Sequence, residues 1–389
     1  MTTLPTDGIV RVSEEDPHRH EAFLPAPTPQ AHAANLVPLP DGELGCAWFG
    51  GTQEGLSDIN VWFSRIGADG AWTAPTQVSS DPDRSEQNPV LFPTPGGELW
   101  LLYTAQYAGN QDTAEVRLRV STDAGRTWGP VRTLVPASST GGVFVRQPIV
   151  VLPSGRWLLP VFHCVRPAEG DWRGDEDTSA VLVSDDNGAT WTHRPVPDST
   201  GCVHMNIVPL RDGTLLALFR RRQADVIHQS RSTDGEHWSA PVPTDLPNNN
   251  SSIQARTLHD GRVALVFNAS SAADATDRRV SLYDEIADDG RTSTNAAAQA
   301  PPPGAAFWGA PRAPLTLALS SDKGRTWPVR RDLEVGDGYC MTNNSRDGLN
   351  RELSYPSITQ TADGWLHIAF TYFRQAIKYL RLSPDWARA

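Results

Sequence analysis

The sequence has few of the features that mark secreted, membrane or cofactor-binding proteins. Its four cysteines, Cys46, Cys164, Cys202 and Cys340, are scattered without metal-ligand spacing, so neither a zinc site nor a disulfide framework is expected. No apolar run reaches the roughly 18 residues of a membrane span, and the first twenty residues lack the charged and apolar regions of a secretory signal. Phosphate-binding loops and dinucleotide fingerprints are absent as well. The sequence therefore predicts a cytoplasmic protein without a metal or an organic cofactor.

Basic residues are fewer than acidic residues, with 34 lysines and arginines against 45 aspartates and glutamates. The formal net charge of the 389 residues is −11 at pH 7. Nucleic acids and anionic membranes attract basic surfaces, so neither is an expected partner. A local basic pocket remains compatible with this balance.

The residues that are abundant favour an all-β chain. Only three methionines occur beside 13 tryptophans, 31 glycines and 32 prolines. Tryptophan is enriched in strands, whereas glycine and proline punctuate turns. This composition predicts many short strands joined by tight turns.

Four copies of a Ser-x-Asp-x-Gly-x-x-Trp motif organise the chain. They occupy residues 121–128, 184–191, 232–238 (one residue shorter) and 320–327. In each copy the aspartate side chain can bond nearby backbone N–H groups and the glycine supplies a positive φ, which together make a tight turn. A motif recurring at such intervals is typical of radial β-repeats.

A second repeat sets the number of blades at six. Apolar strand-like runs surround tight turns that end at Gly42, Gly97, Gly155, Gly213, Gly261 and Gly364. We predict one six-bladed β-propeller domain over residues 1–389, with blades at about 25–75, 76–132, 133–195, 196–242, 243–330 and 331–389. The segment 9–13 (IVRVS) is expected to add an outer strand that closes the ring on the last blade. The Ala- and Pro-rich stretch at about 286–310 is an inserted loop, either over the active-site face or in solvent.

Polar residues occur in register at the start of the innermost strands. Counting back nine or ten residues from each turn glycine gives His32, Asn88, Arg146, His204, Ser252 and Tyr355. The innermost strands of a propeller line its axial funnel, so these side chains are expected to converge. The register predicts a polar pocket at one end of the axis.

These motifs resemble the sialidase superfamily over nearly the whole chain, where the Ser-x-Asp repeat is known as the Asp-box. The chain is most similar to the bacterial BNR-repeat family described as predicted neuraminidases. The resemblance implies a six-bladed propeller that holds a substrate carboxylate with three arginines. It also implies a tyrosine nucleophile paired with a glutamate, and an aspartate as the acid/base catalyst.

Several residues match these implied roles. Arg312, in the run leading into the last Asp-box, matches one carboxylate arginine, and Arg220, at the end of the run LLALF, matches a second. Tyr355 in SYPSI is placed at the nucleophile position, and Asp58 at that of the acid.

The chain departs from the family pattern at two positions. His32 stands where the first-blade arginine is expected, and His204 stands where the glutamate partner of the tyrosine is expected. Glu352 is a candidate to orient Tyr355 or to replace the missing glutamate. Arg146 is a candidate for the third positive charge, and Arg374 is either a further site residue or a surface residue.

The resemblance and the departures together leave three functions open. The first is exo-hydrolysis of a terminal anionic sugar, an ulosonic or uronic acid, from an oligosaccharide, with Asp58 or Glu54 as the acid. The second is a lyase in which His204 and Tyr355 transfer protons at a uronate. The third is a non-catalytic sugar-binding propeller. In every case the expected partner is an anionic oligosaccharide.

Overall fold

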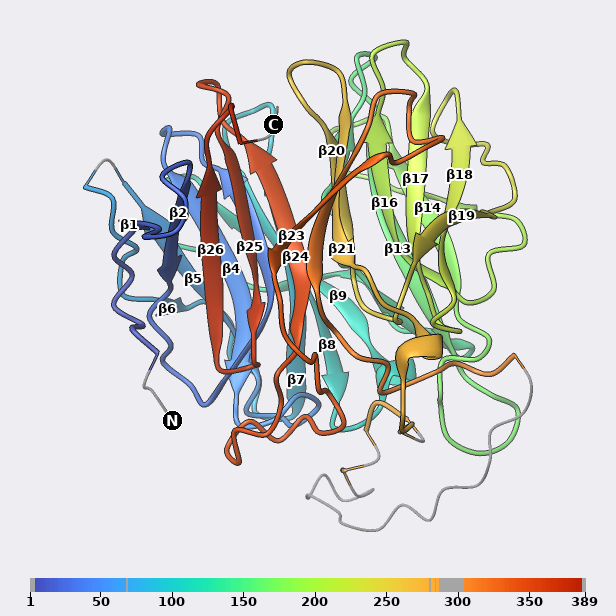
Figure 1. The fold of residues 1–389 in the computed structure, drawn as a ribbon. Helices are drawn as coiled ribbons and strands as arrows, with labels where there is room; N and C mark the ends of the chain where they lie inside the picture. Colours follow the sequence, from blue (N-terminus) through green and yellow to red (C-terminus); the bar gives the residue numbers. More distant parts are fainter. Residues whose placement is uncertain (1–3, 68, 280, 284, 287–303, 387–389) are drawn as a thin grey trace.

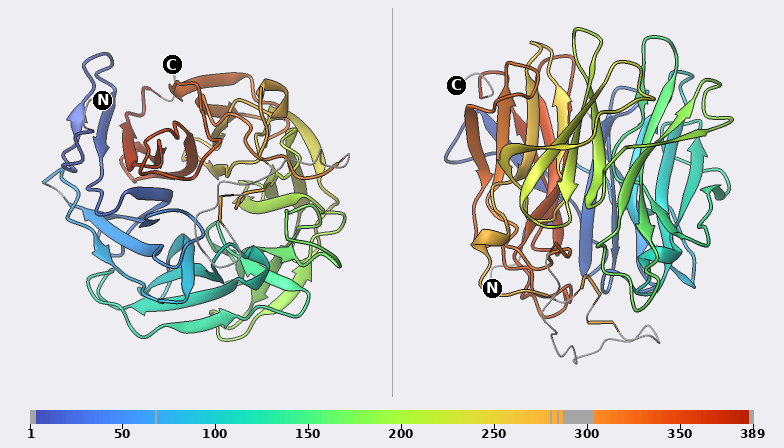
Figure 2. Two further views of the ribbon diagram at one scale, coloured as in Figure 1. Left: turned by 90° about the horizontal axis from the view of Figure 1, so that it is seen from below. Right: turned by 90° about the vertical axis from the view of Figure 1, so that its right-hand side faces the viewer.

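The computed structural model describes residues 4–67, 69–279, 281–283, 285–286 and 304–386. Its strands form six antiparallel sheets arranged around a central axis, best seen along that axis in Figure 2. Helix is confined, within the described ranges, to two short 3₁₀ turns, η1 (Gln111–Thr113) and η2 (Ala272–Asp274). Neither is long or apolar enough to cross a membrane. The predicted all-β, six-bladed propeller is confirmed.

Five of the six sheets are built from consecutive strands (Figure 1). The first consists of β3 (Gln30–Pro38), β4 (Leu44–Gly51), β5 (Asn60–Ile66) and β6 (Thr76–Gln77). The second consists of β7 (Arg84–Pro93), β8 (Leu99–Tyr107), β9 (Glu115–Ser121) and β10 (Arg132–Val135). The third consists of β11 (Gly141–Phe144), β12 (Val150–Val151), β13 (Trp157–Val165), β14 (Thr178–Ser184) and β15 (Thr192–Pro195).

The next two sheets follow the same plan. The fourth consists of β16 (Cys202–Pro209), β17 (Leu215–Arg221), β18 (Val226–Ser232) and β19 (Val242–Pro247). The fifth consists of β20 (Gln254–Thr257), β21 (Val263–Asn268), β22 (Leu315–Ser320) and β23 (Val329–Glu334). In the chain between β21 and β22, residues 287–303 of the predicted insert lie outside the described residues.

The sixth sheet joins the two ends of the chain. Its inner strands are β24 (Leu353–Gln360), β25 (Leu366–Tyr372) and β26 (Ala376–Leu382), and β2 (Arg19–Phe23) pairs with β26. Strand β1 (Arg11–Val12), from the segment expected to close the ring, lies one strand further out and pairs with β2. The strand β2 buries Ala22 in the core, whereas both residues of β1 are exposed. Burial of an apolar side chain therefore favours β2 as the strand that docks on the blade.

The hydrophobic core lies between neighbouring blades. Trp100 of the second blade packs edge-on against Trp157 of the third, with ring centroids 5.3 Å apart, and Phe92 lies 4.9 Å from the same Trp157 ring. Such aromatic contacts add to the free energy gained by burying apolar area. Each blade is therefore stabilised by the blades beside it.

The repeated Ser-x-Asp turns connect neighbouring blades. In the second turn, Ser184 Oγ donates to Asp186 Oδ1 at 2.8 Å and accepts from the Gly188 N–H at 2.8 Å. Thr190 Oγ1 donates to Asp186 Oδ2 at 2.6 Å. Gly188 has a φ of +81°, and a Cβ placed on it would lie 2.5 Å from the Trp100 ring of the preceding blade. The glycine thus allows both the left-handed backbone and the close contact.

Candidate functional site

Four of the inner strands carry a bulge in the first half of the strand. Ala33, Asn88, His204 and Tyr355 have φ values of 61°, 49°, 53° and 53°, and the ladder to the second strand of each blade shifts register there. A non-glycine residue in the left-handed region costs about 1–2 kcal/mol. Bulges of this kind redirect side chains and are common beside active sites.

In three blades the bulge falls on the polar residue that the sequence predicted at the start of the innermost strand. Asn88, His204 and Tyr355 are the left-handed residues of their strands. In the first blade that residue is Ala33, one position after His32, and the fifth blade has Asn250, with a φ of 55°, two positions before Ser252.

Tyr355 is the centre of a cluster of arginines. Its side chain is buried, and its hydroxyl accepts a hydrogen bond from Arg220 Nη1 at 2.6 Å. The guanidinium carbons of Arg146, Arg220 and Arg312 lie 5.3, 5.7 and 5.7 Å from the centroid of the phenol ring. Three guanidinium groups therefore lie within cation–π range of the phenol ring.

Arg220 is held by two further side chains. Its Nε donates to Asn250 Oδ1 at 2.7 Å, and its Nη1 lies 3.3 Å from His204 Nε2. Burial lowers the pKa of Arg220 to about 10. Sequence reasoning missed Asn250, although the run of three asparagines was a signal, because asparagine tolerates the left-handed region better than most residues.

His204 is neutral and faces Arg220 instead of the Tyr355 hydroxyl. Burial, followed by the positive charge of Arg220, lowers the pKa of His204 well below 6.5. The imidazole Nε2 therefore accepts from Arg220, which places the proton on Nδ1. The centroids of the His204 and Tyr355 rings are 5.7 Å apart.

Glu352 binds arginines from two blades. Its fully buried carboxylate accepts from Arg312 Nη1 at 3.0 Å and forms an ion pair with Arg374 Nε at 3.1 Å. Burial opposes ionisation, but Arg312 and Arg374 outweigh it and lower the pKa of Glu352 well below 4.5. Among its described contacts, Glu352 thus acts on the arginines and not on the Tyr355 hydroxyl.

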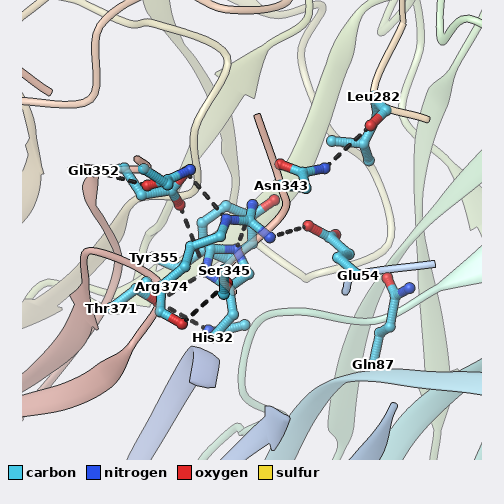
Figure 3. Close-up of polar contacts among 12 residues, drawn as sticks. His32, Glu54, Gln87, Leu282, Asn343, Ser345, Glu352, Tyr355, Thr371 and Arg374 are labelled. Carbon is cyan, nitrogen blue, oxygen red and sulfur yellow. Dashed lines mark hydrogen bonds and ion pairs between the residues drawn. The ribbon is translucent and has the colours of Figure 1, made fainter. Parts of the chain in front are cut away.

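Arg374 lies between two buried carboxylates, Glu352 and Glu54, as Figure 3 shows. Its Nη1 donates to Glu54 Oε2, and its Nη2 lies 3.4 Å from Nε2 of His32. Arg374 is therefore a buried residue of the site. Its guanidinium lies beside the imidazole of His32, the residue that stands where the first-blade arginine was expected.

His32 completes this side of the cluster. Its ring centroid is 4.3 Å from that of Tyr355, and its Nδ1 lies 2.9 Å from Thr371 Oγ1. Burial, followed by the charge of Arg374, lowers the pKa of His32 well below 6.5. His32 is thus a neutral residue beside the phenol ring.

The remaining predicted residues differ in burial and in their contacts with the arginine cluster around Tyr355. Asp58 is exposed, and its Oδ2 accepts from the Thr52 N–H at 3.1 Å, whereas Glu54 is buried against Arg374. Asn88 is buried, and its Oδ1 has no hydrogen-bond partner among the described residues. Ser252 Oγ accepts from Arg146 Nε at 3.2 Å.

The segments that flank the insert pack on the same face as Tyr355. The Trp308 ring lies 5.7 Å from the guanidinium carbon of Arg220, and its Nε1 donates to the Arg173 carbonyl at 3.0 Å. The Tyr283 hydroxyl lies 3.1 Å from the amide nitrogens of both Gln106 and Gln111. These two aromatic residues anchor the ends of the insert on blades two to four.

No group of three or more histidine, cysteine, aspartate or glutamate side chains converges to hold a metal ion in the part of the chain that the structure describes.

Known proteins share this architecture. A sialidase named Hadza microbial sialidase Hz136 superposes with a TM-score of 0.66 at 15% identity, over 92% of this chain and 66% of that one, so this chain spans about two thirds of its length. The intramolecular trans-sialidase of Ruminococcus gnavus gives 0.65 at 14% identity over 100% of both chains. A protein of unknown function from Dyadobacter fermentans gives 0.65 at 16% identity over 98% of both. Curated protein sequences include no match to this chain.

The six blades and these structural neighbours show that the protein has the propeller fold found in sialidases. Within that class, the model of the BNR repeat-like domain matches residues 42–368, and the chain belongs to this family.

Proposed function

We propose that this protein is a sialidase-like exo-glycoside hydrolase that removes a terminal ulosonic or uronic acid from an oligosaccharide. The observation that carries the proposal is the 2.6 Å hydrogen bond from Arg220 to the Tyr355 hydroxyl inside a ring of buried arginines. Neither Arg146 nor Arg220 has a carboxylate partner among the described residues, so the site carries excess positive charge. An anionic ligand would offset this charge.

Arg220 and Arg312 are the residues that we propose bind the substrate carboxylate. Their guanidinium carbons are each 5.7 Å from the Tyr355 ring centroid. Guanidinium groups bind carboxylates through charge-assisted, often bidentate hydrogen bonds. A structural neighbour, the Ruminococcus gnavus trans-sialidase, was solved with oseltamivir carboxylate, which agrees with an anionic ligand.

The proposed reaction begins when the Tyr355 oxygen attacks the anomeric carbon. The bond from that carbon to the aglycone oxygen breaks, and Glu54 or Asp58 protonates the departing oxygen. Water then cleaves the glycosyl–tyrosine bond and releases the free sugar.

His204 is the proposed acceptor of the tyrosine proton in the substrate complex, provided that substrate binding to Arg220 releases His204 Nε2 from its 3.3 Å contact with Arg220 Nη1. In the free protein, burial and the charge of Arg220 hold the pKa of His204 well below 6.5. A carboxylate bound to Arg220 would offset that charge and make His204 a better base. Substrate binding would then couple to proton transfer.

The second candidate is a lyase that acts on a uronate. The neutral imidazoles of His32 and His204 have ring centroids 4.3 and 5.7 Å from that of Tyr355, at positions where sialidases are expected to have arginine and glutamate. A histidine and a tyrosine can abstract the proton beside an arginine-bound carboxylate and protonate the leaving oxygen.

Product analysis distinguishes the candidates. The purified protein is incubated with sialosides, ulosonides and uronate-capped oligosaccharides, and both reducing ends and near-ultraviolet absorbance are followed. New reducing ends without absorbance support the hydrolase, whereas an absorbing unsaturated uronate supports the lyase. Thermal stabilisation by a ligand without any product indicates a sugar-binding propeller.

Tyr355→Phe is the decisive variant. We expect it to abolish turnover and to change the dissociation constant of an anionic ligand by less than about threefold, because only the hydroxyl is lost. Tyr107→Phe, at an exposed tyrosine, is the matched control. Full turnover by Tyr355→Phe would eliminate Tyr355 as nucleophile and as proton-transfer group.

A further inference from the structure

The bulge that presents Tyr355 leaves backbone carbonyls outside the sheet ladder. The pairing of β24 with β25 passes from Ser354 directly to Ser357, so Tyr355 and Pro356 are skipped. In the first blade the pairing of β3 with β4 skips Ala33 and Ala34 in the same way. A buried carbonyl without a hydrogen bond costs about 1–3 kcal/mol, so another group must bond to these oxygens.

Arg146 supplies the missing donors from the third blade. It lies in the chain between β11 and β12, and its Nη2 lies 3.0 Å from the Ala34 carbonyl, 3.1 Å from that of Tyr355 and 3.2 Å from that of Pro356. Its Nε donates to Ser252 of the fifth blade. One guanidinium thereby links the third, fifth, sixth and first blades.

The surroundings of Arg146 differ from those of a carboxylate-binding arginine. Its side chain is 1% exposed, and the described protein groups already engage Nη2 and Nε. Only Nη1 lacks a partner among the described residues. Its guanidinium carbon lies 5.3 Å from the ring centroid of Tyr355, the residue whose main-chain oxygen it binds.

We infer that Arg146 is a positioning residue, which holds the left-handed backbone of Tyr355 so that the phenol hydroxyl reaches Arg220, and that it does not bind the substrate carboxylate. The kinetic part of this inference rests on the proposed function. The structural part does not.

Crystal structures of Arg146→Met and Arg146→Lys test the structural part. Methionine removes every donor, and lysine keeps the charge but cannot bond the three carbonyls and Ser252 together. We expect Tyr355 to leave the left-handed region and to lose the Arg220 contact in Arg146→Met, with a smaller displacement in Arg146→Lys. Ser252→Ala, which removes only the Nε partner, is the control and should leave Tyr355 in place.

An unchanged Tyr355 backbone and an unchanged Tyr355–Arg220 hydrogen bond in either Arg146 variant would overturn the inference, whatever the protein's activity. If Arg146→Met does not fold, Arg146→Lys carries this test alone. A failure of the proposed function is recognised separately, because the wild-type protein then turns over no sugar in the panel.

Kinetics on the substrate found in that panel separate positioning from binding. A positioning role predicts that kcat of Arg146→Met falls about 100-fold while KM stays within about threefold, with part of kcat restored in Arg146→Lys. A KM raised more than about tenfold with kcat preserved would instead assign Arg146 Nη1 to the substrate carboxylate and contradict the inference.

Discussion

At the scale of single residues, Glu352 sets the charge of the site. Its buried carboxylate compensates Arg312 and Arg374, which come from different blades and would otherwise repel each other. The strength of this arrangement comes from burial, because charges interact more strongly away from water. The same burial makes the loss of one partner costly.

We therefore predict that Glu352→Gln lowers the free energy of unfolding by about 3 kcal/mol, since it leaves two buried guanidiniums undercompensated. Urea unfolding at pH 7 measures the change. Glu14→Gln, at an exposed glutamate, should change the free energy of unfolding by less than about 0.5 kcal/mol. Equal stabilities of Glu352→Gln and the wild type would show that Glu352 is not the main counter-charge.

The two arginines that we propose bind the substrate carboxylate differ in their hydrogen-bond partners. Arg312 is bound to Glu352, whereas the described partners of Arg220 are Asn250, His204 and the Tyr355 hydroxyl. The positive charge of Arg220 is therefore less compensated by protein groups than that of Arg312, so Arg220 should attract an anionic ligand more strongly.

We expect Arg220→Met to weaken binding of an anionic sugar by about 2–3 kcal/mol and Arg312→Met to weaken it by a smaller amount. Isothermal titration calorimetry with the ligand found in the panel measures both. Arg325→Met, on the rim, is the control and should bind like the wild type. Losses under about 0.5 kcal/mol in both site variants would place the carboxylate elsewhere.

At the scale of the element, the Ser-x-Asp turns act as connectors between blades. A Cβ at Gly125, Gly188, Gly235 or Gly324 would meet Phe63, Trp100, Leu158 or Leu216 at 2.5–2.7 Å, and each of these side chains belongs to the preceding blade. The repeated motif thus reflects a repeated contact. This explains why each copy of the motif marks the contact of one blade with the blade before it.

Gly188→Ala should lower the melting temperature more than Gly213→Ala. Both glycines have φ near +80°, but a Cβ at Gly213 meets nothing within 4 Å. The backbone cost, about 1–2 kcal/mol, is therefore common to both, and steric overlap with Trp100 is added only at Gly188. Differential scanning calorimetry of the two variants measures the difference. Equal melting temperatures would refute the connector role of the turn.

At the scale of the whole molecule, buried histidines link stability to pH. Burial lowers the pKa of His32 and His204 well below 6.5 and that of His367 to about 4. The unfolded chain therefore takes up more protons than the native one as pH falls below 6.5, which destabilises the fold. Glu86 acts in the opposite direction, because burial raises its pKa to about 7.

Three histidines outweigh one glutamate, so the free energy of unfolding should fall by about 3 kcal/mol between pH 7 and pH 5. Urea titrations across this range measure the fall. His367→Gln, outside the arginine cluster, should reduce the fall by about 2 kcal/mol, which is more than half of it. A free energy that is constant or rises toward pH 5 would contradict the native state having neutral histidines.

The fold could be predicted from the sequence because each blade repeats the same local signals. Turn glycines and Ser-x-Asp motifs lie within a few residues of the strands they join, so a linear pattern contains them. The strand that docks on β26 was not predicted, because β2 is selected by burial of Ala22 and not by an alternating pattern.

The site was only partly predictable, because its contacts join distant blades. Tyr355, Arg220 and Arg312 follow from family resemblance, and the structure brings them together. The role of Arg146 depends on bulges in the first and sixth blades, and no local pattern encodes these register shifts. Asp58 could not be separated from Glu54 by sequence, because both lie in one loop and only the fold buries Glu54 against Arg374.

The pairing of β2 with β26 also affects biosynthesis. During translation Arg19–Phe23 emerges more than three hundred residues before Ala376–Leu382, its partner in the sixth sheet. The edge of β2 that pairs with β26 must therefore stay open while the intervening blades form, although β1 can already pair with the other edge. Ring closure is consequently a late, long-range step, and until it occurs the open edge of β2 can pair with another chain.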